Sequence, residues 1–409
     1  MLVIMKVLQI NALYGHGSTG TIVRDIEYLC ELSGNECYVA SPDPKVRKAK
    51  RGYLIGNGID HKLHAIISRV HGKQAYYSHI PTHNLLQWID KIMPDIVHLH
   101  NLHSNYINLN MLLKYLAKRD IRTVYTFHDC WLFTGGCFHY ASVECKKWQT
   151  DCSHCPKKYS DTPAFLSKKS AEILADRKQY VNAIPRLTII GASEWVANEC
   201  KHSVLFSCNI GYIHNGFDLD IFKPTASDLR KRYGLEGKYV LLGSAMKWYN
   251  PLNTDTYKYF VSNMSEDMVL VLFGCSTIHK KLIKNVIEIG FIYEPKEMAA
   301  LYSMADIFVN CTREDTLPGV NLECQATGTP VVTYDATGCK ETISGHCGRA
   351  VKTGDYEALY EAVLEIRSIG KPALSEKCIA WIRDNFEKGN SYQQYIDLYK
   401  HIYKDKLED

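Results

Sequence analysis

Short β-rich runs alternate with amphipathic helical stretches along most of the chain. We expect strands at Val7–Ala12, Cys37–Ser41, Asp95–His100, Thr123–His128, Leu187–Ala192, Tyr239–Ser244, Met268–Phe273, Ile307–Cys311 and Pro330–Tyr334. Several of these are continuous runs of Val, Ile and Leu, which is typical of strands buried on both faces of a parallel sheet. Repeated strand–helix units predict a doubly wound α/β architecture.

The segments between these strands carry apolar residues at helical spacing. In Thr21–Leu32, for example, Ile22, Ile26 and Leu29 fall on one face of a helix. Similar spacing predicts helices at Leu109–Ala117, Lys168–Asn182, Tyr356–Ile366 and, in the tail, Ser391–Lys404.

The strand–helix series restarts near the middle of the chain. One series runs from Val7 to about Ala192, a second begins at Tyr239, and the turn-rich segment Ile213–Pro224 lies between them. We therefore expect two Rossmann-like domains, at residues 1–218 and 219–388, and a C-terminal helix at 389–409. Ligands bind such folds at the carboxyl ends of the strands, so we expect the two domains to face each other across a cleft.

Composition excludes several classes of protein. Hydrophobic residues make up 46% of the 409 residues and charged residues 22%, as in soluble globular proteins. The formal net charge of +4 is too small to indicate a nucleic-acid partner by itself. No apolar run reaches the roughly 18 residues of a membrane span, and Met1–Lys6 lacks the pattern of a signal peptide. We therefore expect the 15 cysteines to be mostly reduced thiols in the cytoplasm.

The segment 314–323, EDTLPGVNLE, carries the clearest indication of chemistry. A loop ending in Pro318 and Gly319 opens a helix, and carboxylates lie in the loop and one turn into that helix. A helix N-terminus offers unpaired N–H groups and the positive end of a dipole, which suit a diphosphate. Carboxylates accept hydrogen bonds from sugar hydroxyls. The segment therefore predicts a pocket for a sugar carried on a nucleoside diphosphate.

A glycine-rich segment follows the first expected strand. Its G-x-G-x-x-G pattern is formed by Gly15, Gly17 and Gly20, with Ser18 and Thr19 inside it. One interpretation is a dinucleotide fingerprint, and hence an NAD(P)-dependent oxidoreductase. That fingerprint requires an acidic residue at the tip of the second strand, whereas Asp43 lies beyond a proline. The alternatives are a flexible loop that closes a strand–helix unit and a loop that faces the interdomain cleft, and the second agrees better with the segment 314–323.

Histidines cluster at the ends of two expected strands. His128 lies where a neutral imidazole could hydrogen-bond a sugar hydroxyl or the reacting centre, although it could instead cap the strand end beside a carboxylate. His98, His100 and His103 form the second group. Because no carboxylate or thiol stands at supporting spacing for a metal, we favour cleft lining or packing for this group.

A cysteine-rich insertion occupies about residues 130–156. Cys137, Cys145, Cys152 and Cys155 could hold a structural zinc as four thiolates, and the alternatives are buried thiols or a disulfide pair.

A dense basic segment contains Lys45, Arg47, Lys48, Lys50 and Arg51. It could lie on an anionic membrane surface that carries a lipid-linked acceptor, and a solvated loop is the alternative.

Taken in order, the motifs resemble those of the retaining GT-B glycosyltransferases of sequence family four, particularly those of bacterial surface-polysaccharide pathways. The resemblance runs from about Lys6 to about Tyr392. It rests on Gly15–Gly20, TFHD at 126–129, GASEW at 191–195, Asn215–Asp218, Tyr302–Asp306 and the acidic loop through Val332. The cysteine-containing insertion is similar to one found in a subset of that family.

The resemblance implies a UDP- or GDP-sugar donor held mainly by the C-terminal domain. It implies a glycan or polyprenyl-linked acceptor held mainly by the N-terminal domain, against which the tail helix would pack. It also implies that catalysis requires no metal. His128 matches the histidine that family members place near the reacting sugar.

The family signature is two glutamates separated by seven residues. Glu323 matches the second, which binds the ribose hydroxyls, and the first falls at Asp315, with Glu314 just before it. Either of these two carboxylates would then position the sugar. Gly319, Val320 and Asn321 would present backbone N–H groups and side-chain contacts to the donor.

The phosphate-binding cations depart from the family pattern. Family members usually place an arginine and a lysine after the strand that matches Tyr239–Ser244, whereas here only Lys247 is cationic. Losing one buried phosphate cation costs roughly a few kcal/mol of leaving-group stabilisation.

We expect a retaining hexosyltransferase of exopolysaccharide, capsule or lipopolysaccharide biosynthesis that is cytoplasmic, and peripheral contact with the inner face of the cytoplasmic membrane would be compatible with this. The alternatives are a non-catalytic GT-B scaffold, which the missing cation favours, and the NAD(P)-dependent oxidoreductase.

Overall fold

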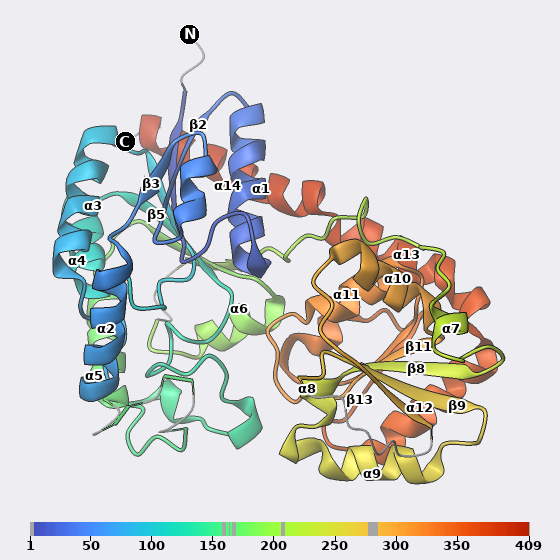
Figure 1. Ribbon diagram of the computed structural model, residues 1–409. Helices are drawn as coiled ribbons and strands as arrows, with labels where there is room; N and C mark the ends of the chain where they lie inside the picture. Colours follow the sequence, from blue (N-terminus) through green and yellow to red (C-terminus); the bar gives the residue numbers. More distant parts are fainter. Residues whose placement is uncertain are drawn as a thin grey trace. The chain divides into compact units, whose positions relative to one another are not determined.

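The computed structural model describes residues 4–157, 161–162, 164–165, 169–205, 209–276 and 285–408, with side chains up to residue 404 (Figure 1). The chain forms two compact units, one of residues 1–215 with 389–409 and one of residues 216–388. The division falls inside the turn-rich segment Ile213–Pro224.

The N-terminal unit is built on a sheet of seven described parallel strands in the order β3-β2-β1-β4-β5-β6-β7. The strands are β1 (Lys6–Ile10), β2 (Glu36–Ser41), β3 (Gly52–Leu54), β4 (Ile96–Leu99), β5 (Arg122–Phe127), β6 (Leu187–Gly191) and β7 (Asn209–Tyr212). β4 and β5 are buried at every position, which is typical of central strands in a parallel sheet. The strand order reverses between β1 and β4, so the segments that follow these two strands flank the place where α/β sheets bind ligands.

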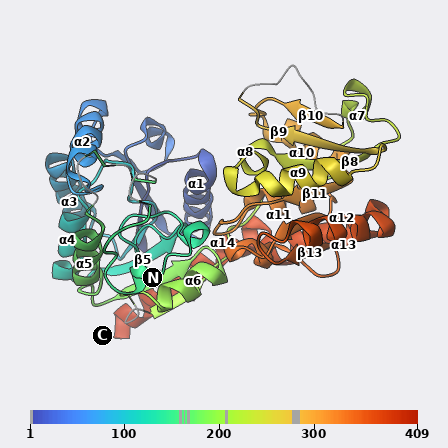
Figure 2. The ribbon, with the colours of Figure 1, turned by 90° about the horizontal axis from the view of Figure 1, so that it is seen from below.

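Helices cover both faces of this sheet. Core residues of α3, α4 and α5 pack on one face, and those of α1 and α14 pack on the other. Figure 2 shows α2, α3, α4 and α5 in a row on one side and α1 on the opposite side. The helices are α1 (Gly17–Leu32), α2 (Gly58–His71), α3 (His79–Ile92), α4 (Leu109–Arg119), α5 (Ser170–Val181), α6 (Glu194–Lys201) and α14 (Lys388–Glu408), with 3-10 turns η1 (Pro44–Lys48), η2 (Ala141–Val143) and η3 (Lys147–Gln149).

The tail helix α14 completes the core of the N-terminal unit. The side chains of Tyr395 and Tyr399 are buried beneath the sheet. The Tyr399 hydroxyl lies 2.5 Å from His98 Nδ1, and the Tyr395 hydroxyl lies 3.0 Å from Thr126 Oγ1. Because His98 Nε2 is also 2.8 Å from Thr126 Oγ1, the tail, β4 and β5 share one buried polar network.

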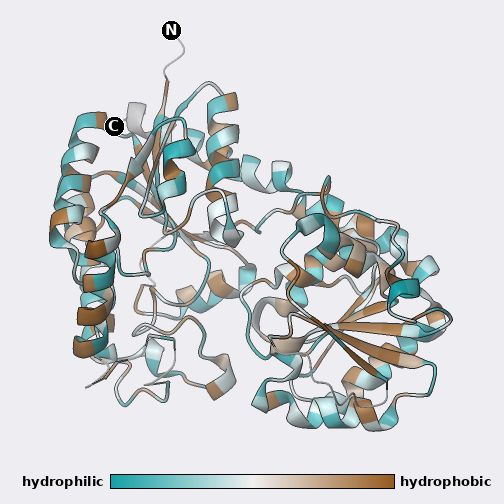
Figure 3. Ribbon diagram, viewed as in Figure 1, coloured by the Kyte–Doolittle hydropathy of each residue, from teal (hydrophilic) through white to brown (hydrophobic). Residues whose placement is uncertain are grey.

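The C-terminal unit has a sheet of six described parallel strands in the order β10-β9-β8-β11-β12-β13. The strands are β8 (Tyr239–Ser244), β9 (Met268–Phe273), β10 (Val286–Ile289), β11 (Ile307–Asn310), β12 (Val331–Tyr334) and β13 (Gly348–Val351). The apolar character of these strands is visible in Figure 3. The strand order reverses between β8 and β11, which defines a second switch point.

Two groups of helices enclose the second sheet. Residues of α8, α9 and α12 share one core cluster, and residues of α10 and α11 share another. The helices are α7 (Leu229–Arg232), α8 (Ala245–Trp248), α9 (Thr254–Asn263), α10 (Pro295–Met304), α11 (Gly319–Ala326), α12 (Tyr356–Ile369) and α13 (Lys371–Phe386), with 3-10 turns η4 (Pro251–Asn253) and η5 (Thr337–Thr342). The doubly wound α/β architecture expected from the sequence is confirmed.

The sequence analysis did not predict the edge strands of the two sheets. The sequence pattern did not indicate β3, β7, β10 or β13, which are short and are not continuous apolar runs. Among the helices, α1 begins at Gly17 rather than Thr21. Lys168, the first residue of another expected helix, lies outside the described residues.

We expect Tyr399→Phe to lower the stability of the full chain by about 1–3 kcal/mol, because it leaves the buried Nδ1 of His98 without a partner. Urea unfolding measures the change. Tyr28→Phe, at a position that is 67% exposed on α1, is the control. Equal unfolding midpoints for the two variants would contradict the assigned role of the tail.

Candidate functional site

The acidic segment lies at the switch point of the C-terminal sheet. Lys247 stands on α8, directly after β8, and the loop that contains Glu314 and Asp315 follows β11. β11 pairs with β8 on one side and β12 on the other. The sequence-predicted residues from Lys247 to Glu323 therefore gather at one end of this sheet.

Asp315 holds the acidic loop in shape. Its carboxylate Oδ1 accepts a hydrogen bond from the Leu317 N–H at 3.3 Å. Its backbone carbonyl accepts from Thr337 Oγ1 at 2.5 Å and from the Gly338 N–H at 3.0 Å. One carboxylate oxygen is thus turned onto the loop's own backbone, while Glu314 is a half-buried side chain next to it.

The N-terminus of α11 is anchored by close packing. A Cβ on Gly319 would lie 3.2 Å from Cζ of Phe217, so a larger residue there would displace the ring. Asn321 is fully buried, and its side chain bonds Asn310 Nδ2 at 2.8 Å and Thr342 Oγ1 at 2.9 Å. Both the amide oxygen and the amide nitrogen of Asn321 are therefore engaged in hydrogen bonds within the protein. The N–H groups of Gly319 and Val320 belong to the first turn, which has no intrahelical partner for them.

Glu323 lies one turn into α11 and faces its N-terminus. Its Oε1 is 4.0 Å from the position that a Cβ on Gly319 would take. Its Oε2 accepts a hydrogen bond from the Tyr302 hydroxyl at 3.0 Å. Burial raises the pKa of Glu323 to about 7, and the hydrogen bond from Tyr302 opposes that rise. Near neutral pH this carboxyl is therefore poised between its two protonation states.

A second cation, which the sequence analysis missed, stands near Lys247. Arg313 Nε donates to Asn253 Oδ1 at 2.9 Å, and Asn253 Nδ2 donates to the carbonyls of Lys247 at 2.9 Å and Cys311 at 2.7 Å. Burial raises the pKa of the Cys311 thiol to about 12, against the opposing charges of Lys247 and Arg313. Both cations are thus within electrostatic reach of one sulfur at the end of β11. In the sequence, Arg313 could have been noticed because it stands directly before Glu314.

The glycine segment of the N-terminal unit forms a tight turn and the first turn of α1. Gly15 and Gly17 have φ values of 70° and 63°, which side-chain-bearing residues rarely adopt. The Gly15 N–H donates to the Gly20 carbonyl at 2.8 Å. Ser18 and Thr19 therefore lie in the helix rather than in a loop.

Asp43 is bound to this turn by the protein itself. Its Oδ2 lies 2.6 Å from His16 Nε2 and accepts from the Tyr14 N–H at 3.2 Å. The carboxylate that a dinucleotide fingerprint would aim at a ribose is therefore engaged with the glycine segment.

His128 stands at the carboxyl end of β5, beside a carboxylate and a second histidine. Asp129 Oδ1 accepts from the Trp131 N–H at 2.8 Å, and Asp129 Oδ2 lies 3.2 Å from His103 Nε2. Burial alone would raise the pKa of Asp129, but His103 and the Trp131 N–H lower it on balance. Burial lowers the pKa of His128 to about 4, so its imidazole is neutral at neutral pH. These side chains line a small pocket together with Asn101 and Thr126.

His98 is packed in the core, whereas His100 lines that pocket. Both are buried, and His100 Nδ1 lies 3.2 Å from His128 Nε2. The structure thus brings His100, His103 and His128 together and directs His98 toward the tail helix.

The expected zinc site is not supported. Cys137, Cys145, Cys152 and Cys155 do line one small cavity, together with Trp148. However, no group of three or more His, Cys, Asp or Glu side chains among the described residues is arranged to hold a metal ion. Burial raises the pKa of Cys152 to about 11, which favours the neutral thiol. None of the described cysteines forms a disulfide.

The chain matches two family profiles. Residues 23–221 match the profile described as Glycosyltransferase Family 4, and residues 256–368 match the profile described as Glycosyl transferases group 1. The first match begins after the glycine segment and includes His128, and the second includes the acidic loop and α11.

Named relatives are similar over most of the chain. A putative colanic acid biosynthesis glycosyl transferase, WcaC of Escherichia coli K12, is 22% identical over 76% of each chain. A GDP-mannose-dependent alpha-mannosyltransferase of Mycobacterium tuberculosis is 22% identical over 84% of this chain and 82% of its own. Among solved structures, Anabaena Alr3699/HepE in complex with UDP-glucose superposes with a TM-score of 0.62 at 15% identity, over 97% of this chain and all of that one.

We expect the pKa of Glu323 to shape the pH dependence of stability. A carboxyl with a pKa near 7 in the folded chain and about 4.5 when unfolded holds its proton in the fold, so stability falls as pH rises between those values. Glu323→Gln removes this fall. Thermal melts at about pH 5.5 and about pH 8 should therefore diverge between wild type and variant. Glu361→Gln, at an exposed position, is the control and should melt in parallel with wild type.

Parallel melting of wild type and Glu323→Gln would show that the Glu323 carboxyl ionises as an ordinary glutamate. The melts need no ligand, so the result does not depend on any assignment of function.

Proposed function

Because the chain is a GT-B glycosyltransferase of family four, we propose that it transfers a hexose, with retention, from a nucleoside diphosphate sugar to a glycan or lipid-linked acceptor. The observation that carries the proposal is the group at the switch point of the C-terminal unit, where two cations, an anchored helix N-terminus and Glu323 lie at the ends of β8 and β11.

The donor would be held by complementary charge. The diphosphate would meet the N–H groups of Gly319 and Val320 and the positive end of α11. Glu323 would accept hydrogen bonds from the ribose hydroxyls with the oxygen that Tyr302 leaves available. We propose that Asn321 acts indirectly, by fixing α11 against β11.

The role of the two cations, Lys247 and Arg313, would be to stabilise the departing diphosphate. When the bond from sugar to diphosphate breaks, negative charge grows on the departing oxygen, and fixed cations stabilise that charge more than they stabilise the ground state. We propose that Lys247 and Arg313 share this role, which replaces the arginine–lysine pair usual in the family. In this arrangement Glu314 would position the sugar, while Asp315 would mainly hold the loop.

The N-terminal unit would bind the acceptor and contact the reacting sugar. His128 would accept a hydrogen bond from a sugar hydroxyl, and the turn from Gly15 to Gly20 would line the acceptor site. The named relatives use different sugars and nucleotides, since one is GDP-mannose-dependent and another is bound to UDP-glucose. The similarity to a colanic acid biosynthesis enzyme supports a place in bacterial surface-polysaccharide synthesis.

A donor screen tests the proposal. We expect one of a panel of UDP-, GDP- and dTDP-sugars to bind in calorimetry and to be hydrolysed slowly without acceptor, with release of the sugar in its retained anomeric form. Lys247→Gln should reduce turnover about 100-fold, as is typical for the loss of one charge-stabilising group. Lys258→Gln, at an exposed position on α9, should be neutral.

The outcomes separate the alternatives. Donor binding without turnover, unaffected by Lys247→Gln, would support a non-catalytic scaffold. Binding of NADH with no binding of any nucleotide sugar would support an oxidoreductase instead.

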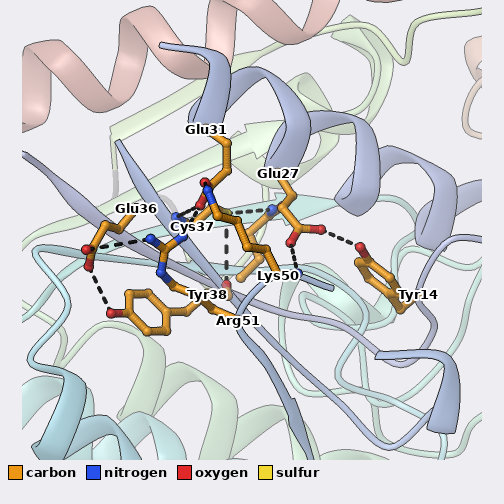
Figure 4. Close-up of polar contacts among 9 residues, drawn as sticks. Tyr14, Glu27, Glu31, Glu36, Cys37, Tyr38, Lys50 and Arg51 are labelled. Atoms are coloured by element: carbon orange, nitrogen blue, oxygen red, sulfur yellow. Dashed lines mark hydrogen bonds and ion pairs between the residues drawn. The ribbon is translucent and has the colours of Figure 1, made fainter. Parts of the chain in front are cut away.

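We also propose peripheral contact with an anionic membrane. In the basic segment of residues 45–51, however, fewer cations are without an ion-pair partner among the described residues than the sequence indicated. Lys50 lies 2.5 Å from Glu31, and Arg51 is ion-paired with Glu31 and lies 3.6 Å from Glu36 (Figure 4). Two of the five cations therefore neutralise glutamates of α1 and β2.

The exposed face of α2 offers a better contact. Ile59, Leu63 and Ile66 are 79%, 55% and 58% exposed and recur at i, i+4 and i+7, on one side of the helix. Lys62 and Arg69 are exposed on the same helix. An apolar stripe with basic neighbours suits insertion at an anionic bilayer surface. No helix in the described ranges is long and apolar enough to span a bilayer.

We expect the full chain to sediment with vesicles containing anionic lipid and not with neutral vesicles. The double change Ile59→Ser and Leu63→Ser should reduce this binding at least about tenfold, because it removes two inserted side chains. Ile369→Ser, at a partly exposed position on α12, is the control. Undiminished binding of the double variant would exclude α2 as the contact.

A further inference from the structure

A chain of hydrogen bonds runs from His128 into the core of the N-terminal unit. His128 Nε2 lies 3.2 Å from His100 Nδ1, and His100 Nε2 lies 3.2 Å from Gln9 Oε1. Gln9 is fully buried on β1, and its Nε2 donates to the backbone carbonyl of Val23 at 3.0 Å. The chain of contacts therefore ends on a group whose polarity is known, because a carbonyl oxygen only accepts hydrogen bonds.

That end point determines the direction of every other bond in the chain. The Gln9 atom that faces Val23 must be the NH₂ group, since the reversed amide would place two acceptors 3.0 Å apart. The atom that faces His100 is then the amide oxygen, which requires His100 Nε2 to donate.

The two histidines are neutral, so each carries a single N–H. Burial lowers the pKa of His100 well below its ordinary range and that of His128 to about 4. With its proton on Nε2, His100 can only accept at Nδ1, and His128 Nε2 must be the donor of the bond between them.

We propose that Gln9, acting through His100, is a positioning residue that fixes His128 as the Nε2–H tautomer and leaves its Nδ1 as an obligate hydrogen-bond acceptor. Nδ1 of His128 is enclosed and has no hydrogen-bond partner within the described residues. A buried polar atom without a partner is costly, so a ligand that supplies a donor there gains affinity.

The tautomer restricts the chemistry of the site. This step rests on the proposed function, in which a sugar reaches His128. An imidazole locked in this form cannot donate a proton to the departing diphosphate or to a ring oxygen. It can only receive a hydrogen bond, so the group it recognises is a hydroxyl of the substrate. A donor that lacks that hydroxyl should lose the benefit of His128 altogether.

The tautomer is measured directly by long-range proton–nitrogen NMR on the full chain labelled with ¹⁵N-histidine. The signals are assigned by their loss in His100→Gln and His128→Gln. We expect Nε2–H forms for His100 and His128 in the wild type. Gln9→Glu keeps an acceptor facing His100, since a neutral carboxyl has the same donor–acceptor pattern as the amide, and should preserve both tautomers. Gln9→Met removes the acceptor and should give tautomer mixtures.

Kinetics provide the second readout. Gln9→Met should lower kcat/KM for the donor about five- to tenfold, the usual effect of losing one neutral hydrogen bond, while Gln9→Glu should remain near wild type. Thermal melts verify that both variants are folded.

The outcomes test the tautomer proposal separately from the proposed glycosyltransferase function. An Nδ1–H form of His128 in the wild type overturns the proposal, whatever the activity. An unchanged tautomer in Gln9→Met overturns the role of Gln9. If the tautomers are as expected but the protein neither binds nor hydrolyses any nucleotide sugar, the role of Gln9 and His100 in fixing the His128 tautomer is supported and the proposed function is overturned.

Discussion

Polar groups buried at the carboxyl ends of parallel strands must find partners inside the protein, and this constraint organises both units. Water cannot reach them, and each unpaired group would cost a sizeable part of the total stability. Asn253 meets the constraint in the C-terminal unit by bridging α8 and β11, and Asn321 meets it by joining α11 to β11. In the N-terminal unit, Gln9, His98 and His100 do the same across β1, β4 and β5. The side chains that we propose to contact substrate lie next to these hydrogen-bonded networks.

The constraint also explains which parts of the fold could be predicted. The central strand β9 is uniformly apolar, so its burial on both faces is visible in the sequence. Edge strands such as β7 need only pair on one side and carry no such mark. The doubly wound fold was predicted correctly from the repeated strand–helix units, and the family was predicted correctly from the order of motifs, because both signals are local in the chain.

The site itself was only partly predictable. Gly319 and Glu323 were singled out from their positions in one motif, and the structure places both in α11. Tyr302 and Asn253 could not be identified in this way, because their contacts join segments 21 and 60 residues apart. The basic segment shows the same limit, because the sequence did not indicate that Lys50 and Arg51 form ion pairs with glutamates of α1 and β2.

The N-terminal unit is discontinuous along the chain, and this has a consequence for biosynthesis. Its first 215 residues leave the ribosome long before α14, the helix that supplies partners for His98 and Thr126. Until α14 has been synthesised, one face of the nascent sheet therefore lacks part of its cover, and a hydrophobic, partly polar surface is open to chaperones or to premature association. The C-terminal unit is contiguous in the chain and can fold as soon as residue 388 has been synthesised. The N-terminal unit, whose synthesis begins first, would therefore be the last to complete its folding.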